Sequence, residues 1–88
     1  MTTIQILTFM NIEIGKTLEV VELLRRIPEI KEISYITGEH DLVILLEGDS
    51  SEDIHNIFTQ QIEKIPFIIR SSSNLMAKRW IVKDSLDQ

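Results

Sequence analysis

Five consecutive apolar residues, Leu42 to Leu46, constrain the fold of this chain more than any other feature. Side chains of a β-strand alternate between its two faces, so a strand that is apolar at every position must be covered on both faces. The segment from Ile4 to Ile12 is similar, because its apolar residues also fall on both parities. We therefore predict two interior strands of a sheet, one in each of these segments.

Two segments with helical periodicity accompany these strands. From Lys16 the apolar residues recur at spacings of three and four, and Pro28 ends the pattern. Ser50 can cap a second helix, with Asp53 at the third helical position, and Pro66 ends that helix. The residues expected to form its buried stripe are Ile54, Ile57, Phe58, Gln61, Ile62 and Ile65.

Two further extended segments and an internal echo complete the pattern. Residues 30–37 and 67–82 are extended in character, and the second segment is polar in its middle. The sequence Arg-Ile-Pro-Glu-Ile at 26–30 is echoed as Lys-Ile-Pro-Phe-Ile at 64–68, each time between a helix and a strand. Two β-α-β halves joined by a tight turn predict an α+β fold, the ferredoxin-like βαββαβ sandwich, with a C-terminal extension.

The length of 88 residues predicts one domain, which we expect over residues 1–83, with 84–88 as a C-terminal tail. A domain of this size is marginally stable alone. The chain has no cysteine and two separated histidines, so disulfides and a structural zinc site are disfavoured. Helices cover only one face of such a sheet, and the doubly apolar strand leaves an apolar second face. We therefore expect a homodimer that packs sheet on sheet, as a dimeric α+β barrel.

The net charge of −5 and the sequence pI of about 4.9 disfavour direct binding to nucleic acid, because an acidic domain releases no counterions from DNA. No apolar run approaches the roughly 18 residues that a membrane-spanning helix requires. The N-terminus has no cationic segment before an apolar stretch, so no signal peptide is expected. These features and the absence of cysteine are compatible with a cytoplasmic protein.

From Ile4 to about Ala77, the ordered motifs resemble the effector-binding half of the Lrp/AsnC (feast/famine) transcription regulators. The turn at 38–42, Gly-Glu-His-Asp-Leu, is similar to the family's Gly-x-aromatic-Asp-apolar hairpin, with His40 in the aromatic position. The polar stretch at 71–74, Ser-Ser-Ser-Asn, resembles the family's Thr-x-Thr stretch. Family regulators carry a helix-turn-helix domain before this one. Here the first strand begins near residue 4, so the resemblance is to a stand-alone form without that domain.

The resemblance implies homodimers, often assembled further into rings of dimers. It also implies an amino-acid effector, bound near the Gly-x-x-Asp turn and between dimers. A full-length Lrp/AsnC regulator is a further candidate partner.

The turn itself supplies the first candidate site residues, Gly38, Glu39, His40 and Asp41. Asp41 could hold an ammonium group while the turn amides meet a carboxylate. Alternatively, Gly38 only provides a positive φ angle and Asp41 only caps the turn. His40 could stack on a ligand or respond to pH, or it could fill the space of the usual aromatic ring. Adjacent residues of a hairpin point in different directions, so Glu39-His40-Asp41 is not expected to bind a metal.

Ser72 and Asn74 lie on one face of the last extended segment, together with Arg70. This polar face could be the floor of a ligand site or a solvent-exposed edge of the sheet. Trp80, further along, is expected to anchor the C-terminal segment against a partner subunit.

No catalytic arrangement, phosphate-binding loop or cofactor motif occurs in the sequence. We expect a non-enzymatic, amino-acid-sensing oligomerisation domain that modulates transcription through partner regulators. One alternative is an enzyme of the dimeric α+β barrel group, similar to small monooxygenases, which would need a polar or histidine-lined cavity between sheet and helices. The predicted inward positions are Ile, Leu, Val and Phe, so that cavity should be filled. Another alternative is an assembly module without a ligand.

Overall fold

The computed structural model describes residues 3–83, so the predicted tail at 84–88 lies outside the described residues. The elements in chain order are β1 (Ile4–Ile12), α1 (Thr17–Leu24), β2 (Ile30–Tyr35), β3 (Leu42–Gly48), α2 (Ser51–Gln60), the short 3₁₀ helix η1 (Ile62–Lys64) and β4 (Ile68–Leu75). The predicted alternation of strand, helix, strand, strand, helix and strand is confirmed.

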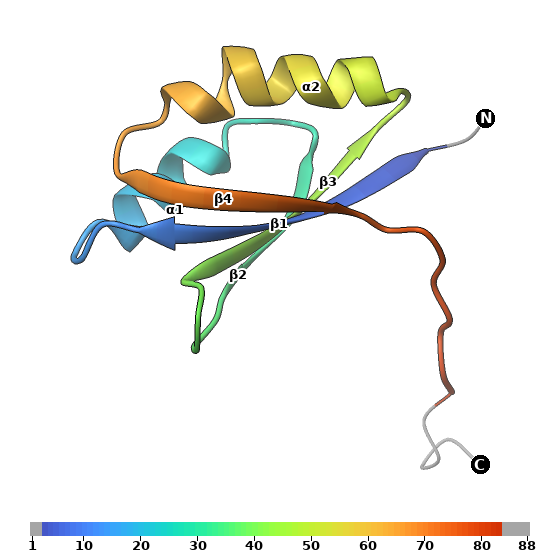
Figure 1. Ribbon diagram of the computed structural model, residues 1–88, viewed down its shortest axis with the longest axis horizontal. Helices are drawn as coiled ribbons and strands as arrows, with labels where there is room; N and C mark the ends of the chain where they lie inside the picture. The colour runs from blue at the N-terminus through green and yellow to red at the C-terminus, as the bar shows by residue number, and fades with distance from the viewer. Residues whose placement is uncertain (1–2, 84–88) are drawn as a thin grey trace.

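The described strands form one antiparallel sheet in the order β2-β3-β1-β4. Both helices lie on the same side of this sheet (Figure 1). The two strands that are apolar on both faces, β1 and β3, are the central ones. This is the ferredoxin-like α+β fold that the element order predicts.

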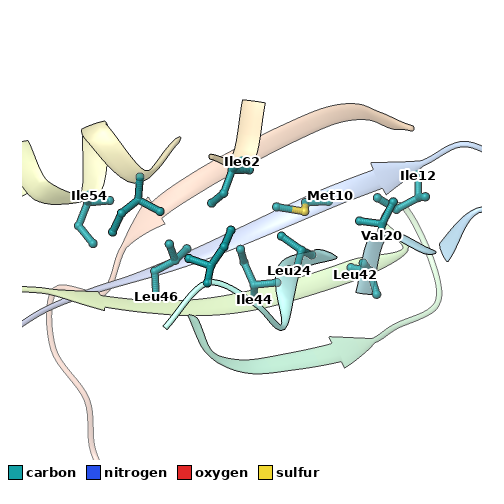
Figure 2. Packing of buried hydrophobic residues seen from close by; sticks show 11 residues of the cluster. Met10, Ile12, Val20, Leu24, Leu42, Ile44, Leu46, Ile54 and Ile62 are labelled. Carbon is teal, nitrogen blue, oxygen red and sulfur yellow. The ribbon is translucent and has the colours of Figure 1, made fainter. Parts of the chain in front are cut away.

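The face of the sheet toward the helices, here called the inner face, carries the hydrophobic core (Figure 2). The core residues with relative exposure of 0% are Met10, Val20, Leu24, Leu42, Ile44 and Leu46. Among residues 3–83, Thr8 is the buried polar side chain, and its Oγ1 lies 2.9 Å from Ser73 Oγ. The space between sheet and helices is therefore filled by hydrocarbon.

The opposite face, here called the outer face, carries a second apolar surface. Its apolar strip consists of Leu7, Phe9, Val43 and Leu45, which pair across β1 and β3. Leu45 is 8% exposed, and the other three are half-buried. Met76 and Arg79, which follow β4, line a shallow pocket of about 160 Å³ beside Leu7 and Leu45. The rest of the strip has no covering layer within the described part of the chain.

Both helices end earlier than the spacing of their apolar residues predicts. α1 ends at Leu24, and Ile27 reaches the core through a tighter turn in which its N–H donates to Leu24 O at 3.0 Å. α2 begins as predicted, because the N–H of Asp53 donates to Ser50 Oγ at 3.1 Å. It ends at Gln60, and η1 follows. Gln61, expected in the buried stripe, is exposed.

The last strand is shorter than its extended pattern. β4 ends at Leu75, whereas the sequence predicted an extended segment as far as Val82. Beyond Met76 the described residues have no regular secondary structure, and Trp80 is 73% exposed. This C-terminal segment leaves the sheet on the side away from the helices (Figure 1). None of the helices between residues 3 and 83 is long and apolar enough to cross a membrane.

Candidate functional site

The hairpin between β2 and β3 contains four of the predicted site residues. The N–H of Ile36 donates to Asp41 O at 2.9 Å and closes the loop. Gly38 has a φ angle of 106°, which is costly for any residue with a side chain. Gly38 therefore supplies the positive φ that the turn needs. Gly38 and Glu39 are exposed, whereas His40 and Asp41 are half-buried.

Asp41 attaches this hairpin to the central strand β1. Its backbone N–H donates to Met10 O at 2.8 Å, and its Oδ2 accepts a hydrogen bond from the N–H of Ile12 at 2.7 Å. The capping role is therefore present in the structure, and it uses one carboxylate oxygen. Within residues 3–83 the other oxygen, Oδ1, accepts no hydrogen bond, so a ligand ammonium could use it.

Asn11 on β1 contacts the candidate site and was not singled out in the sequence analysis. Its Nδ2 donates to the backbone O of Glu39 at 2.6 Å, and its Oδ1 lies 3.1 Å from His40 Nδ1. The ring of His40 also lies against Phe9, with centroids 5.4 Å apart and planes at 43°. The sequence did contain a sign of this residue. Asn11 is polar and lies on the same face of β1 as the apolar Leu7 and Phe9.

The polar face of β4 lies beside these residues only in part. In the register of β1 with β4, Arg70 is opposite Asn11 and Ser72 is opposite Phe9. Asn74 is opposite Leu7, two residues or roughly 6.6 Å further from the hairpin. The structure thus brings Ser72 and Arg70 to the hairpin end of the outer face and leaves Asn74 further along the strip.

The chemical character of this site suits a small zwitterion. Asp41 offers a carboxylate oxygen, and the turn amides, Arg70 and Ser72 offer donors. Among residues 3–83, no three His, Asp or Glu side chains gather as a metal site would require. The exposed hairpin covers a ligand on one side only, so enclosure of an amino acid needs a second surface.

The family model of the Lrp/AsnC ligand-binding domain matches residues 7–86. Because this match covers most of the chain, the protein belongs to the Lrp/AsnC ligand-binding domain family.

Two solved structures are similar over nearly their full length. FFRP-DM1 is 33% identical, with a TM-score of 0.78, and the match covers 82% of this chain and 96% of that one. The protein PHS023 from Pyrococcus horikoshii is 32% identical, with a TM-score of 0.80, and the match covers 86% of this chain and 92% of PHS023. No curated protein sequence gave a significant match.

A further structure with a similar fold belongs to a longer protein. It is the transcriptional regulator NMB0573 from Neisseria meningitidis, whose structure is a complex with L-Met. It is 16% identical, with a TM-score of 0.77, and the match covers 93% of this chain and 55% of the regulator. At this identity the likeness shows the shared fold.

Proposed function

We propose that this chain is an amino-acid-sensing assembly domain that modulates transcription by acting on partner regulators. The observation that carries the proposal is its membership of the Lrp/AsnC ligand-binding domain family, together with a hairpin that keeps one Asp41 oxygen available. Residues 3–83 contain this one domain and no DNA-reading helix pair, so a full-length Lrp/AsnC regulator is the proposed link to DNA. Such a role would place the protein in the cytoplasm.

The proposed effector site is the hairpin Gly38–Asp41. Asp41 Oδ1 would accept the effector's ammonium, and the turn amides would meet its carboxylate. Ser72 would line the floor, and Asn74 would contribute only to a longer effector, because it lies further along the strip. The complex of the N. meningitidis regulator with L-Met supports an amino acid as the class of effector.

The proposed assembly is a homodimer that buries the outer face. The strip of Leu7, Phe9, Val43 and Leu45 is flanked by polar residues, and most of it lacks a covering layer in the described part of the chain. Burial of apolar surface contributes about 25 cal/mol per Å², so a second copy is a favourable cover. A ring of such dimers would supply the second wall of each hairpin site.

The enzyme alternative is disfavoured by the filled interior. A small monooxygenase-like enzyme would need a reaction cavity between sheet and helices. In residues 3–83 that layer holds apolar side chains and Thr8, whose hydroxyl is hydrogen bonded to Ser73. We therefore propose a role without catalysis.

The test combines calorimetry with mass measurement in solution. Each standard amino acid is titrated into the chain, and the molar mass is measured with and without it by light scattering. We expect at least one amino acid to bind and to shift the mass toward a larger assembly. Binding of none of them, with an unchanged dimer, would instead identify an assembly module without a ligand.

A further inference from the structure

The hydrogen bonds of Asn11 determine which nitrogen of His40 carries its proton. An amide oxygen only accepts, and an amide nitrogen only donates. Asn11 Nδ2 must face the carbonyl oxygen of Glu39, because a flipped amide would place two acceptors 2.6 Å apart. Asn11 Oδ1 therefore faces His40 Nδ1 at 3.1 Å, and that nitrogen must donate.

Because Nδ1 of His40 always donates, the other ring nitrogen, Nε2, accepts in one protonation form of the ring and donates in the other. In the neutral ring with the proton on Nδ1, Nε2 carries a lone pair and accepts. In the imidazolium both nitrogens donate. Histidine changes between these forms in the range of about pH 5 to 8. Near His40, Nε2 thus repels an anion when the ring is neutral and donates to it when the ring is an imidazolium.

Arg70, which carries a permanent positive charge, occupies the position of β4 in the same row. It lies directly opposite Asn11 on the outer face, and the Cβ atoms of such pairs are about 5 Å apart. Within residues 3–83 no carboxylate forms an ion pair with Arg70. His40, Asn11 and Arg70 therefore form a row across the sheet, beside Phe9 and Ser72.

We propose that His40, Asn11 and Arg70 form a carboxylate-binding subsite at the hairpin end of the outer face, and that this subsite binds its carboxylate more tightly when His40 is protonated. Asn11 is its positioning residue, because it acts through the tautomer of His40. The other charged groups around the imidazole are Glu39 and Asp41 of the same hairpin and Glu13 just beyond β1. Toward the ring, the outer faces of β1 and β3 present the uncharged Phe9 and Val43.

The subsite deepens the proposed function and can also be tested without it. The carboxylate could come from the side chain of an acidic amino acid or from the α-carboxylate that every amino acid carries. Calorimetry at about pH 5.5 and about pH 8 would compare glutamate, glutamine and glutarate. Glutarate carries two carboxylates and no ammonium, so it does not depend on Asp41.

We expect glutamate and glutarate to bind at least about tenfold more tightly at the lower pH, because an imidazole is more often protonated there and only the protonated ring offers the Nε2 donor. If the side-chain carboxylate is recognised, glutamine will lack this pH effect. If the α-carboxylate is recognised, glutamine will share it. Either result supports the subsite. Affinities of glutamate and glutarate that do not change with pH would overturn it.

Single substitutions can distinguish a direct effect on carboxylate binding from a loss of hairpin stability. Arg70→Gln should weaken glutarate binding about tenfold or more at both pH values. Arg25→Gln, which removes the same charge from the residue that follows α1, should leave glutarate binding unchanged. His40→Phe keeps a ring against Phe9 and should abolish the pH effect. If Arg70→Gln binds glutarate as the parent does, the subsite is refuted.

The tautomer has its own readout. The ¹⁵N chemical shifts of the ring should show Nδ1–H for neutral His40 in the parent chain. Exposed His55 on α2 serves as an internal reference. In Asn11→Ala the proton is free to move to Nε2, so the pH effect on glutarate binding should shrink. A parent His40 with its neutral proton on Nε2 would overturn the proposal.

The outcomes distinguish the subsite from the proposed function. Amino acids that bind with no pH effect and no need for Arg70 would leave the function standing and remove the subsite. Glutarate binding that needs Arg70, without binding of any amino acid, would do the reverse. No binding of either kind would overturn both.

Discussion

The two carboxylate oxygens of Asp41 have different surroundings. Oδ2 accepts from the N–H of the buried Ile12 at the end of β1. Oδ1 has no partner among residues 3–83. One side chain can therefore stabilise the hairpin and bind an ammonium at the same time, and substitutions should separate these two roles.

Asp41→Asn retains a neutral acceptor for the Ile12 N–H but removes the negative charge. We expect amino-acid affinity to fall by about 1.5–3 kcal/mol, the scale of a hydrogen bond to a charged group. Asp41→Ala should lose the same affinity and also about 1–3 kcal/mol of the free energy of unfolding, because a buried N–H is left unpaired. Calorimetry and urea unfolding would measure the two losses, and both variants should remain dimeric. Equal amino-acid affinity in the parent and in Asp41→Asn would move the site away from the hairpin.

At this scale the sequence predicted the residues of the turn but not their partners. The positive φ of Gly38 follows from local chemistry alone. The bonds of Asn11 do not, because its partner Glu39 is 28 residues away and depends on the register of β1 with the hairpin. For the same reason, the sequence could not decide between the capping and the binding role of Asp41.

The first turn of α2 depends on its cap. The hydroxyl of Ser50 accepts from the N–H of Asp53, one of the N–H groups that a helix cannot satisfy internally. Ser50→Ala should lower the free energy of unfolding by about 1 kcal/mol. Ser51→Ala is the matched control, because Ser51 is exposed and begins the helix without capping it. Equal urea midpoints for Ser50→Ala and the parent would contradict the capping role.

The order of the strands and helices was predictable from the periodicity of apolar residues. The residues at which they end depend on neighbouring strands and on core contacts elsewhere in the chain. β4 could have continued to Val82 on pattern alone. Its neighbour β1 begins at Ile4, and Met76 N–H already donates to Gln5 O. Beyond that point, residues 3–83 offer no further strand to pair with it. In the same way, α1 ends at Leu24 because a tighter turn places Ile27 in the core.

At the scale of the whole molecule, the outer face should determine the assembly. Val43 lies in the middle of the apolar strip, so Val43→Asp would bury a charge between two sheets. We expect the parent chain to be a dimer at micromolar concentration and Val43→Asp to be a folded monomer. Light scattering would measure the mass, and circular dichroism would check the fold.

The matched control for this variant is Asn56→Asp. Asn56 is exposed on α2, on the helix side of the sheet, so the added charge lies away from the outer face. This variant should remain dimeric. A parent chain that is already monomeric, or a dimeric Val43→Asp, would refute the sheet-on-sheet interface.

The charge of the whole chain leads to a prediction about DNA. With a net charge of −5, the isolated chain gains no counterion-release affinity for the duplex. We expect no sequence-specific complex at physiological salt in fluorescence anisotropy, with or without amino acids. A saturable, sequence-specific signal from this chain alone would contradict the proposed action through partners.

The strand order β2-β3-β1-β4 interleaves the two halves of the chain. The first half of the chain contains β1 and β2, and the second half contains β3 and β4. The two strands of each half are not neighbours in the sheet, so neither half can form this sheet on its own. Both partners of β1 lie far along the chain, and the hydroxyls of Thr8 and Ser73 meet across 65 residues of sequence. Closing such loops costs entropy before the contacts form, which slows folding. During synthesis the first strand must therefore remain unpaired until β3 and then β4 have left the ribosome, and the domain should fold in one late, cooperative step.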